Sequence, residues 1–469
     1  MSDSSTLKNS NMIDNAPTAN PLGVAPLGKL ITKFAIPSII AMLVSSLYNI
    51  VDQIFIGNYV GELGNAATNI AFPLSTLCTS VSLLLGIGGA AAFNLNMGAG
   101  KSDDAGRYIG NSVGVAIIVG TILSVVTQVF LKPMLLFFGS SDSILPYAAE
   151  YTRITAFGFP FLILSIAGGH LIRADGKPTV AMTCNLTGAI INVILDTLFV
   201  AVMGLGMKGA AIATIIGQVA AAAIAAYHLM HFSTVRLSSR DFIPNIRYFG
   251  RSANLGMSQG FNQIAMMIVQ IVLNNTLKHY GAASVYGSDI PIAVVGVSTK
   301  LAMLYFSICI GLSQAVQPIS SFNYGAGNYA RTKKAFTKAR NAGTVASVTA
   351  FLLFQLFPRQ LISIFGSGSD LYFDFAIKYL RIYMFFTFVN NIQPLVSTFF
   401  SAIGKPQRGL FLSLTRQLIF LLPLIVVLPL MLGLDGLVYA GLIADGMAFI
   451  VATIFITREF SRPEYKQTT

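Results

Sequence analysis

Residues 63–100 read LGNAATNIAFPLSTLCTSVSLLLGIGGAAAFNLNMGAG, a run of 38 residues without a single Asp, Glu, Lys or Arg. A helix needs about 20 predominantly apolar residues to cross the hydrocarbon layer of a membrane, which is ~30 Å thick. Two more uncharged runs cover residues 252–277 and 301–330. These runs predict membrane-spanning helices, because a helix satisfies its own backbone hydrogen bonds in lipid.

The composition of the whole chain agrees with a membrane protein. Of its 469 residues, 54% are hydrophobic and 10% are charged, against about 25% charged residues in soluble domains. This excludes an ordinary soluble enzyme. The net charge of +12 does not indicate nucleic-acid binding, because the basic residues lie in short loops between apolar runs. Cys78, Cys184 and Cys309 fall within apolar spans without a CxxC pair, which predicts neither disulfides nor a zinc site.

We expect an all-α polytopic membrane protein with twelve transmembrane helices. Charges, Gly/Pro clusters and turn signals divide the chain. The last predicted span ends near Thr457. The twelve predicted spans begin near Phe34, Ala66, Ile109, Ile154, Val180, Gly209, Ser252, Ile292, Asn341, Leu380, Leu410 and Gly436. Residues 1–26 are rich in Ser, Asn and Asp and predict a disordered cytoplasmic tail. We expect residues 458–469 to form a second cytoplasmic tail.

Basic residues set the expected orientation. With the N-terminus inside, 21 of the 30 Lys and Arg residues fall in inside segments and eight fall outside. Because inside loops carry the excess of Lys and Arg, both termini are predicted to lie in the cytoplasm. The expected location is the bacterial plasma membrane.

The two halves of the chain repeat each other. Three short motifs recur in the same order at an offset of 227 or 228 residues: GAG (98–100 and 325–327), FGS (138–140 and 365–367) and GKP (176–178 and 404–406). An offset of six spans gives two copies in the same orientation, an arrangement found in secondary transporters. We therefore expect a six-helix lobe over residues 27–231, a cytoplasmic inter-lobe loop over 232–250 and a second six-helix lobe over 251–457, around a central cavity.

Five motifs then identify a family. They are YNIVD (48–52), RADGKP (173–178), NVILD (192–196), GAAIAT (209–214) and GLSQAVQPISSFNYGAG (311–327). With these motifs the chain resembles the multidrug and toxic compound extrusion (MATE) family from about residue 26 to 457. The resemblance implies a twelve-helix, cation-coupled exporter of amphipathic, often cationic organic compounds, of the kind that confers antibiotic resistance.

Carboxylates inside the predicted spans indicate function independently of the family resemblance. A charge at mid-membrane costs about 3 kcal/mol or more, so Asp52 and Asp196 are expected to be functional. Tyr48 and Asp52 are four residues apart, as are Asn192 and Asp196, which places each pair on one helix face. Such a cluster can take up a proton or hold Na⁺ through oxygen ligands. The alternative is that the two acids only hydrogen-bond neighbouring helices.

The resemblance implies a cation site at Tyr48, Asp52, Asn192, Asp196 and Thr214, with Na⁺ placed at Asp52, Asn192 and Asp196 if Na⁺ is the coupling ion. Some members of the family have an Asn late in span 4, where this chain has Gly168-Gly169-His170. The choice between H⁺ and Na⁺ therefore stays open. His170 by itself is interpreted as a packed histidine rather than a proton relay.

The C-terminal half lacks the acid cluster. Asn192 and Asp196 correspond to Phe420 and Leu424 at the offset of 228 residues, so we expect ion coupling in the N-terminal lobe. Asp445 is interpreted as structural, as a partner of Arg416, although its depth also suits a functional role. For the substrate cavity we expect the amides of Gln53, Gln259, Gln263, Asn390 and Gln393, with helix packing as an equal alternative.

The sequence thus predicts a monomeric antiporter that exports amphipathic, cationic compounds in exchange for H⁺ or Na⁺. Membrane lipids and small molecules are its expected partners, and no cofactor is expected beyond the coupling ion. The alternative is a flippase for a lipid-linked or polysaccharide precursor, which would favour several basic residues in the cavity. A membrane-embedded enzyme ranks below both, because the four His and the acids form no recognisable catalytic set.

Overall fold

The computed structural model describes residues 20–287, 289–365 and 368–466, which form helices and turns and contain no β-strand. The spans of the first half are α2 (Leu27–Tyr59), α3 (Glu62–Gly98), α4 (Ser102–Val129), α6 with α7 (Leu145–Thr155 and Phe159–Ala174), α8 (Pro178–Asp196) and α9 (Gly206–Met230). Those of the second half are α10 (Ile246–Ala282), α11 (Asp289–Gly325), α12 (Tyr329–Leu356), α14 with α15 (Asp370–Tyr383 and Ile392–Ala402), α16 with α17 (Pro406–Leu414 and Leu422–Leu432) and α18 (Leu434–Phe460). Short helices α5 (Leu131–Phe137) and α13 (Pro358–Ser363) follow α4 and α12. The all-helical fold with twelve spans is confirmed.

Nine helices of the described chain are long and apolar enough to cross a membrane. The three other predicted spans, α10, α12 and α14 with α15, carry more polar residues. Basic residues gather in the first turns of α10 and α12, at Arg247, Arg251, Arg331 and Lys333. Long basic side chains at a helix end can reach the headgroup region while the rest of the helix crosses the lipid.

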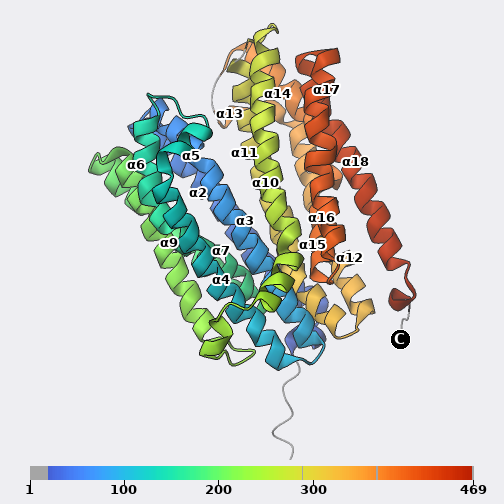
Figure 1. The fold of residues 1–469 in the computed structure, drawn as a ribbon. Coiled ribbons are helices and arrows are strands. Elements are labelled where there is room, and N and C mark those ends of the chain that lie inside the picture. Colours follow the sequence, from blue (N-terminus) through green and yellow to red (C-terminus); the bar gives the residue numbers. More distant parts are fainter. Residues whose placement is uncertain (1–19, 288, 366–367, 467–469) are drawn as a thin grey trace, which may run out of the picture.

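The helices form two lobes (Figure 1). Helices α2 to α9, in blue to green, make one group, and α10 to α18, in yellow-green to red, make the other. The lobes meet at the end of the molecule where the described chain begins and ends, and they lean apart at the opposite end. We call the end at which the lobes meet the terminal end.

Glycines allow the lobes to touch at backbone distance along α3. A Cβ on Gly88 would lie 1.8 Å from the carbonyl oxygen of Ser252 in α10, and one on Gly256 would lie 2.0 Å from the carbonyl oxygen of α3 residue Leu84. Gly98 and Gly325 make the equivalent close approach between α3 and α11. We call these four glycines the glycine seam. Any side chain at Gly88 or Gly256 would hold the lobes apart.

The duplicated motifs form the same turn in both halves. Gly100 and Gly327 have φ angles of 74° and 72°, and Gly176 and Gly404 have φ angles of 80° and 75°. In all four turns the glycine N–H donates to the carbonyl three residues back, and the next N–H donates to the carbonyl five residues before it. This helix-ending turn requires positive φ, which glycine adopts without steric cost. The third repeated motif falls partly on residues 366–367, outside the described residues.

Residues 20–26 are structured, where we expected a disordered tail over residues 1–26. They form helix α1 (Pro21–Val24) and the turn into α2, and Leu22 is 3% exposed. The Leu22 carbonyl accepts a hydrogen bond of 2.9 Å from the Asn323 amide of α11. Composition alone did not reveal this docking, because it depends on the surface of α11. Residues 1–19 lie outside the described residues.

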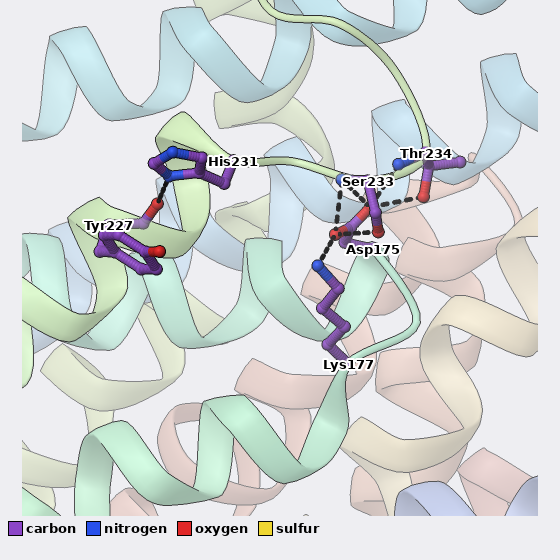
Figure 2. Close-up of polar contacts among 6 residues, drawn as sticks. All are labelled: Asp175, Lys177, Tyr227, His231, Ser233 and Thr234. Atoms are coloured by element: carbon purple, nitrogen blue, oxygen red, sulfur yellow. Dashed lines mark hydrogen bonds and ion pairs between the residues drawn. The ribbon is translucent and has the colours of Figure 1, made fainter.

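The loop between the lobes is tied to the N-terminal lobe by Asp175, which follows α7 (Figure 2). Its carboxylate accepts hydrogen bonds from the backbone N–H and the hydroxyl of both Ser233 and Thr234, with backbone distances of 3.0 and 2.9 Å to its nearest oxygens. Lys177 Nζ lies 3.5 Å from the same carboxylate. Just before the loop, His231 Nδ1–H donates to the Tyr227 carbonyl. A single carboxylate thus fixes where the chain leaves the first lobe.

Candidate functional site

Two carboxyl groups meet inside the N-terminal lobe. Asp52 comes from the last third of α2, and Asp196 is the final residue of α8. Their side chains interact directly. α2 begins at Leu27, close to where the described chain starts, so Asp52 lies towards the far end of that helix. The four-residue spacings place Tyr48 and Asn192 one turn before the acids, on the same helix faces.

Asn192 links the acid pair to α9. With its amide oriented to satisfy both neighbours, its nitrogen donates to Asp196 Oδ2 at 2.8 Å and its oxygen accepts from the Thr214 N–H at 3.1 Å. The Thr214 hydroxyl donates to the Ala210 carbonyl at 2.9 Å. Asn192 is 2% exposed and Asp196 is 0% exposed, so this network is closed off from solvent. It fixes Asp196 in one position.

Two phenols complete the cluster. Tyr48 and Tyr151 both interact with the Thr214 hydroxyl and lie close to the two acids. Tyr151 is in α6 and was missed by the sequence analysis, because no carboxylate or amide side chain lies four residues from it on its helix face. We call Tyr48, Asp52, Tyr151, Asn192, Asp196 and Thr214 the acid cluster.

The acid cluster has unused acceptors. Asp52 Oδ1 and Asp196 Oδ1 are both enclosed by protein atoms and have no hydrogen-bond partner in the described chain. Two ionised carboxylates in contact repel each other strongly where water is excluded. A proton shared between them, or a cation bound by their oxygens, removes that repulsion. The residues present therefore fit either H⁺ or Na⁺, since all the ligands on offer are oxygens.

The backbone is irregular at this point. α8 continues as a π-helix, η2 (Thr197–Val202), which begins directly after Asp196. π-turns widen a helix and occur frequently at functional sites. A second π-helix, η5 (Thr415–Leu421), interrupts the corresponding span of the C-terminal lobe and contains Arg416. Both lobes therefore depart from α-helical geometry next to a charged residue.

The amides expected to line a cavity have mixed environments. Gln259 donates to Thr398 Oγ1 at 3.0 Å, and Gln393 donates to the Leu412 carbonyl at 2.7 Å. These two bonds join neighbouring helices, which agrees with the alternative that the amides serve helix packing. Gln53 is exposed and Gln263 is half-buried, and neither makes a side-chain hydrogen bond within the described chain. Within the described residues, Gln53 and Gln263 therefore lack the interhelical hydrogen bonds that Gln259 and Gln393 make.

The C-terminal lobe contains a separate ionic group. Arg416 Nε donates to Asp445 Oδ1 at 2.6 Å, so the suggested pairing of these residues is present. Asn390, which we expected in the substrate cavity, is 7% exposed and donates to Asp445 Oδ2 at 2.5 Å. His170 is 3% exposed and accepts a 2.9 Å hydrogen bond from Arg173, as a packed histidine does.

Known proteins share this architecture along nearly the full chain. MepA, the multidrug export protein of Staphylococcus aureus strain MSSA476, is 24% identical over 434 residues, which cover 92% of this chain and 94% of MepA. The FAD transporter of Shewanella oneidensis is 23% identical over 453 residues, covering 95% and 97%. Among solved structures, an outward-facing multidrug resistance MATE family transporter superposes with a TM-score of 0.87 at 23% identity, covering 96% of this chain and 98% of that one.

A structure of a MATE protein in complex with MaL6 gives a TM-score of 0.88 at 23% identity, covering 96% and 99%. The MatE family model matches residues 37–198 and 260–427, one segment in each lobe. The first matched segment contains Asp52 and Asp196, and the second contains Arg416. The chain therefore belongs to the MATE family of multi-pass membrane transporters, which are secondary transporters and not enzymes.

Proposed function

We propose that this MATE efflux transporter exports amphipathic organic cations and that H⁺ or Na⁺ entering at the acid cluster drives the export. The observation that carries the proposal is the contact between Asp52 and Asp196, each with an enclosed oxygen that has no partner. An acid pair kept in the membrane without a permanent counter-charge is costly to fold. It is explained if the pair binds and releases a cation during each cycle.

The position of the pair suits exchange with the outside. We propose that the terminal end is cytoplasmic and that the membrane is the bacterial plasma membrane, as the distribution of basic residues predicts. The acid cluster then lies towards the external side. A cation arriving from outside neutralises the pair, and this favours release of a cationic substrate by removing negative charge from the lobe.

The return step uses the same charges. When the lobes close outside and part at the glycine seam, the cation leaves to the cytoplasm and the lobe again attracts a positively charged compound. Each elementary charge that crosses a potential of 100 mV supplies about 2.3 kcal/mol. One or two coupling ions per cycle therefore supply enough free energy for a substantial substrate gradient. The export of multiple drugs by MepA, as its name states, supports a broad substrate range.

Everted membrane vesicles provide the test. Ethidium, a fluorescent organic cation, is added to vesicles that carry either an H⁺ gradient or an Na⁺ gradient, imposed separately. We expect ethidium to accumulate under one of the two gradients and to leave when that gradient is dissipated. Accumulation that needs neither gradient, or that requires added ATP, would contradict the proposal.

A further inference from the structure

The pair formed by Arg416 and Asp445 is not needed for the cation cycle described above. Arg416 lies in η5 and Asp445 in the middle of α18, so both are well inside their spans. Burying an ion pair is weak evidence for a stabilising role, because apolar residues of similar volume often serve as well.

The guanidinium of Arg416 is only partly engaged. Its Nε–H donates to Asp445, and within the described residues neither terminal amino group has a hydrogen-bond partner. Neither terminal nitrogen is among the polar atoms that are enclosed without a partner, so both face accessible space. The Arg416 side chain is 17% exposed, whereas that of Asp445 is 1% exposed. Within the described residues, the two terminal amino groups of Arg416 therefore make no hydrogen bond to the carboxylate.

The Asp445 carboxylate cannot readily rotate to accept hydrogen bonds from the terminal amino groups of Arg416. Its Oδ2 accepts from Asn390, and its Oδ1 accepts from Arg416 Nε. Hydrogen bonds from two different helix spans therefore fix the carboxylate along one side of the guanidinium. The two terminal amino groups each keep one N–H that points in the same direction as the other. These two parallel N–H groups have the spacing that binds both oxygens of a second carboxylate.

Aromatic rings lie close to the Arg416 guanidinium. The guanidinium carbon lies 5.9 Å from the centre of the Phe306 ring. Tyr383 lies near Arg416 and stacks on Tyr379 with ring centres 4.7 Å apart. Phe306 and Tyr383 are both half-buried, so each has ring surface to offer. A flat apolar body and an acidic group would find complementary surfaces here.

We propose that the open end of Arg416 binds the carboxylate of amphipathic aromatic compounds. The transporter would then accept acids and zwitterions through the C-terminal lobe in addition to cations through the acid cluster. A monoanion is the favoured charge, because Asp445 already neutralises Arg416 and a dianion would leave more excess charge in the membrane. This inference extends the proposed export function, but the binding itself requires neither an ion gradient nor the acid cluster.

The test compares two probes that differ only in charge. Anthracene-9-carboxylate and the neutral anthracene-9-carboxamide are each equilibrated with the purified full-length protein in a nonionic detergent at neutral pH, and binding is measured by equilibrium dialysis. We expect the protein to prefer the carboxylate. The double variant Arg416→Gln/Asp445→Asn removes both charges without leaving one unpaired, and it should lower carboxylate affinity about tenfold while leaving the carboxamide unchanged.

The single variant Asp445→Asn separates binding from packing. It removes the competing negative charge while its amide oxygen can still accept from Nε, so carboxylate affinity should rise several-fold. If the pair is only structural, the double variant and Asp445→Asn should change binding of both probes in the same direction, or not at all. Either result, or equal affinity of the native protein for the two probes, would overturn the proposal. Asp52→Asn should bind the carboxylate normally, which keeps this outcome separate from failure of the cation cycle.

Discussion

Replacing Gly88 with alanine tests whether the glycine seam closes the terminal end. The added Cβ would lie 1.8 Å from the carbonyl oxygen of Ser252, and ordinary van der Waals contact begins at 3.4 Å. The obstacle is backbone, which cannot rotate away as a side chain can. Helices α3 and α10 must therefore separate by about 1.5 Å at this point, or the lobes must part.

The expected cost is that of overpacking a close helix contact, about 1–3 kcal/mol. It applies only while the lobes touch at the terminal end, so it shifts the conformational equilibrium by about five- to 150-fold towards the state in which that end is open. Gly256→Ala should act in the same way from the other lobe, because its Cβ would meet the Leu84 carbonyl oxygen at 2.0 Å. Gly296→Ala is the matched control, since nothing lies within 4 Å of its Cβ position.

Spin labels report the result directly. Lys101→Cys and Lys334→Cys place one label on each lobe at exposed positions of the terminal end, and the three native cysteines are buried. Electron paramagnetic resonance should show a longer distance gaining population in Gly88→Ala and Gly256→Ala, and an unchanged distribution in Gly296→Ala. If Gly88→Ala keeps the native distribution at normal yield, the seam does not control this opening.

Three more outcomes are expected. Asp175→Ala removes the carboxylate that accepts the four hydrogen bonds from Ser233 and Thr234. It should lower the thermal unfolding midpoint of the purified protein, consistent with a cost of about 1–3 kcal/mol. An unchanged midpoint would show that these bonds do not hold the inter-lobe loop. In intact cells, an impermeant maleimide should label Glu62→Cys but not Ser239→Cys, and the reverse pattern would invert the topology. Gln263→Ala should change the relative export rates of different compounds at normal protein abundance, whereas Gln393→Ala should reduce abundance and all rates together, because it breaks an interhelical bond; equal behaviour of the two would refute the distinction.

Much of the fold could be predicted because membrane spans are encoded locally. Uncharged runs mark helices, and the constant offset between the GAG and GKP motifs marks two equivalent lobes. The same local logic placed Tyr48 with Asp52 and Asn192 with Asp196 on their helix faces. It worked because four-residue spacing is a property of a single helix.

Contacts between distant segments were harder to predict. Asn390 lies 55 residues from Asp445 in sequence, and Arg416 lies 29 residues from it, so no spacing rule connects Asn390 to the pair. Tyr151 joins the acid cluster only because α6 packs beside α9. The docking of Leu22 against α11 likewise depends on tertiary contacts, while composition describes only the polarity of the tail.

Uphill transport in proteoliposomes tests most directly whether Asp52 and Asp196 couple an ion gradient to export. Asp52→Asn and Asp196→Asn retain volume and hydrogen-bonding capacity but lose the charge, while Asp103→Asn alters an exposed carboxylate outside the site. We expect the first two variants to bind ethidium and to exchange it down its own gradient, but not to concentrate it under an imposed H⁺ or Na⁺ gradient. Asp103→Asn should concentrate it. Gradient-driven accumulation at the native rate in both site variants would contradict a coupling role for the two acids.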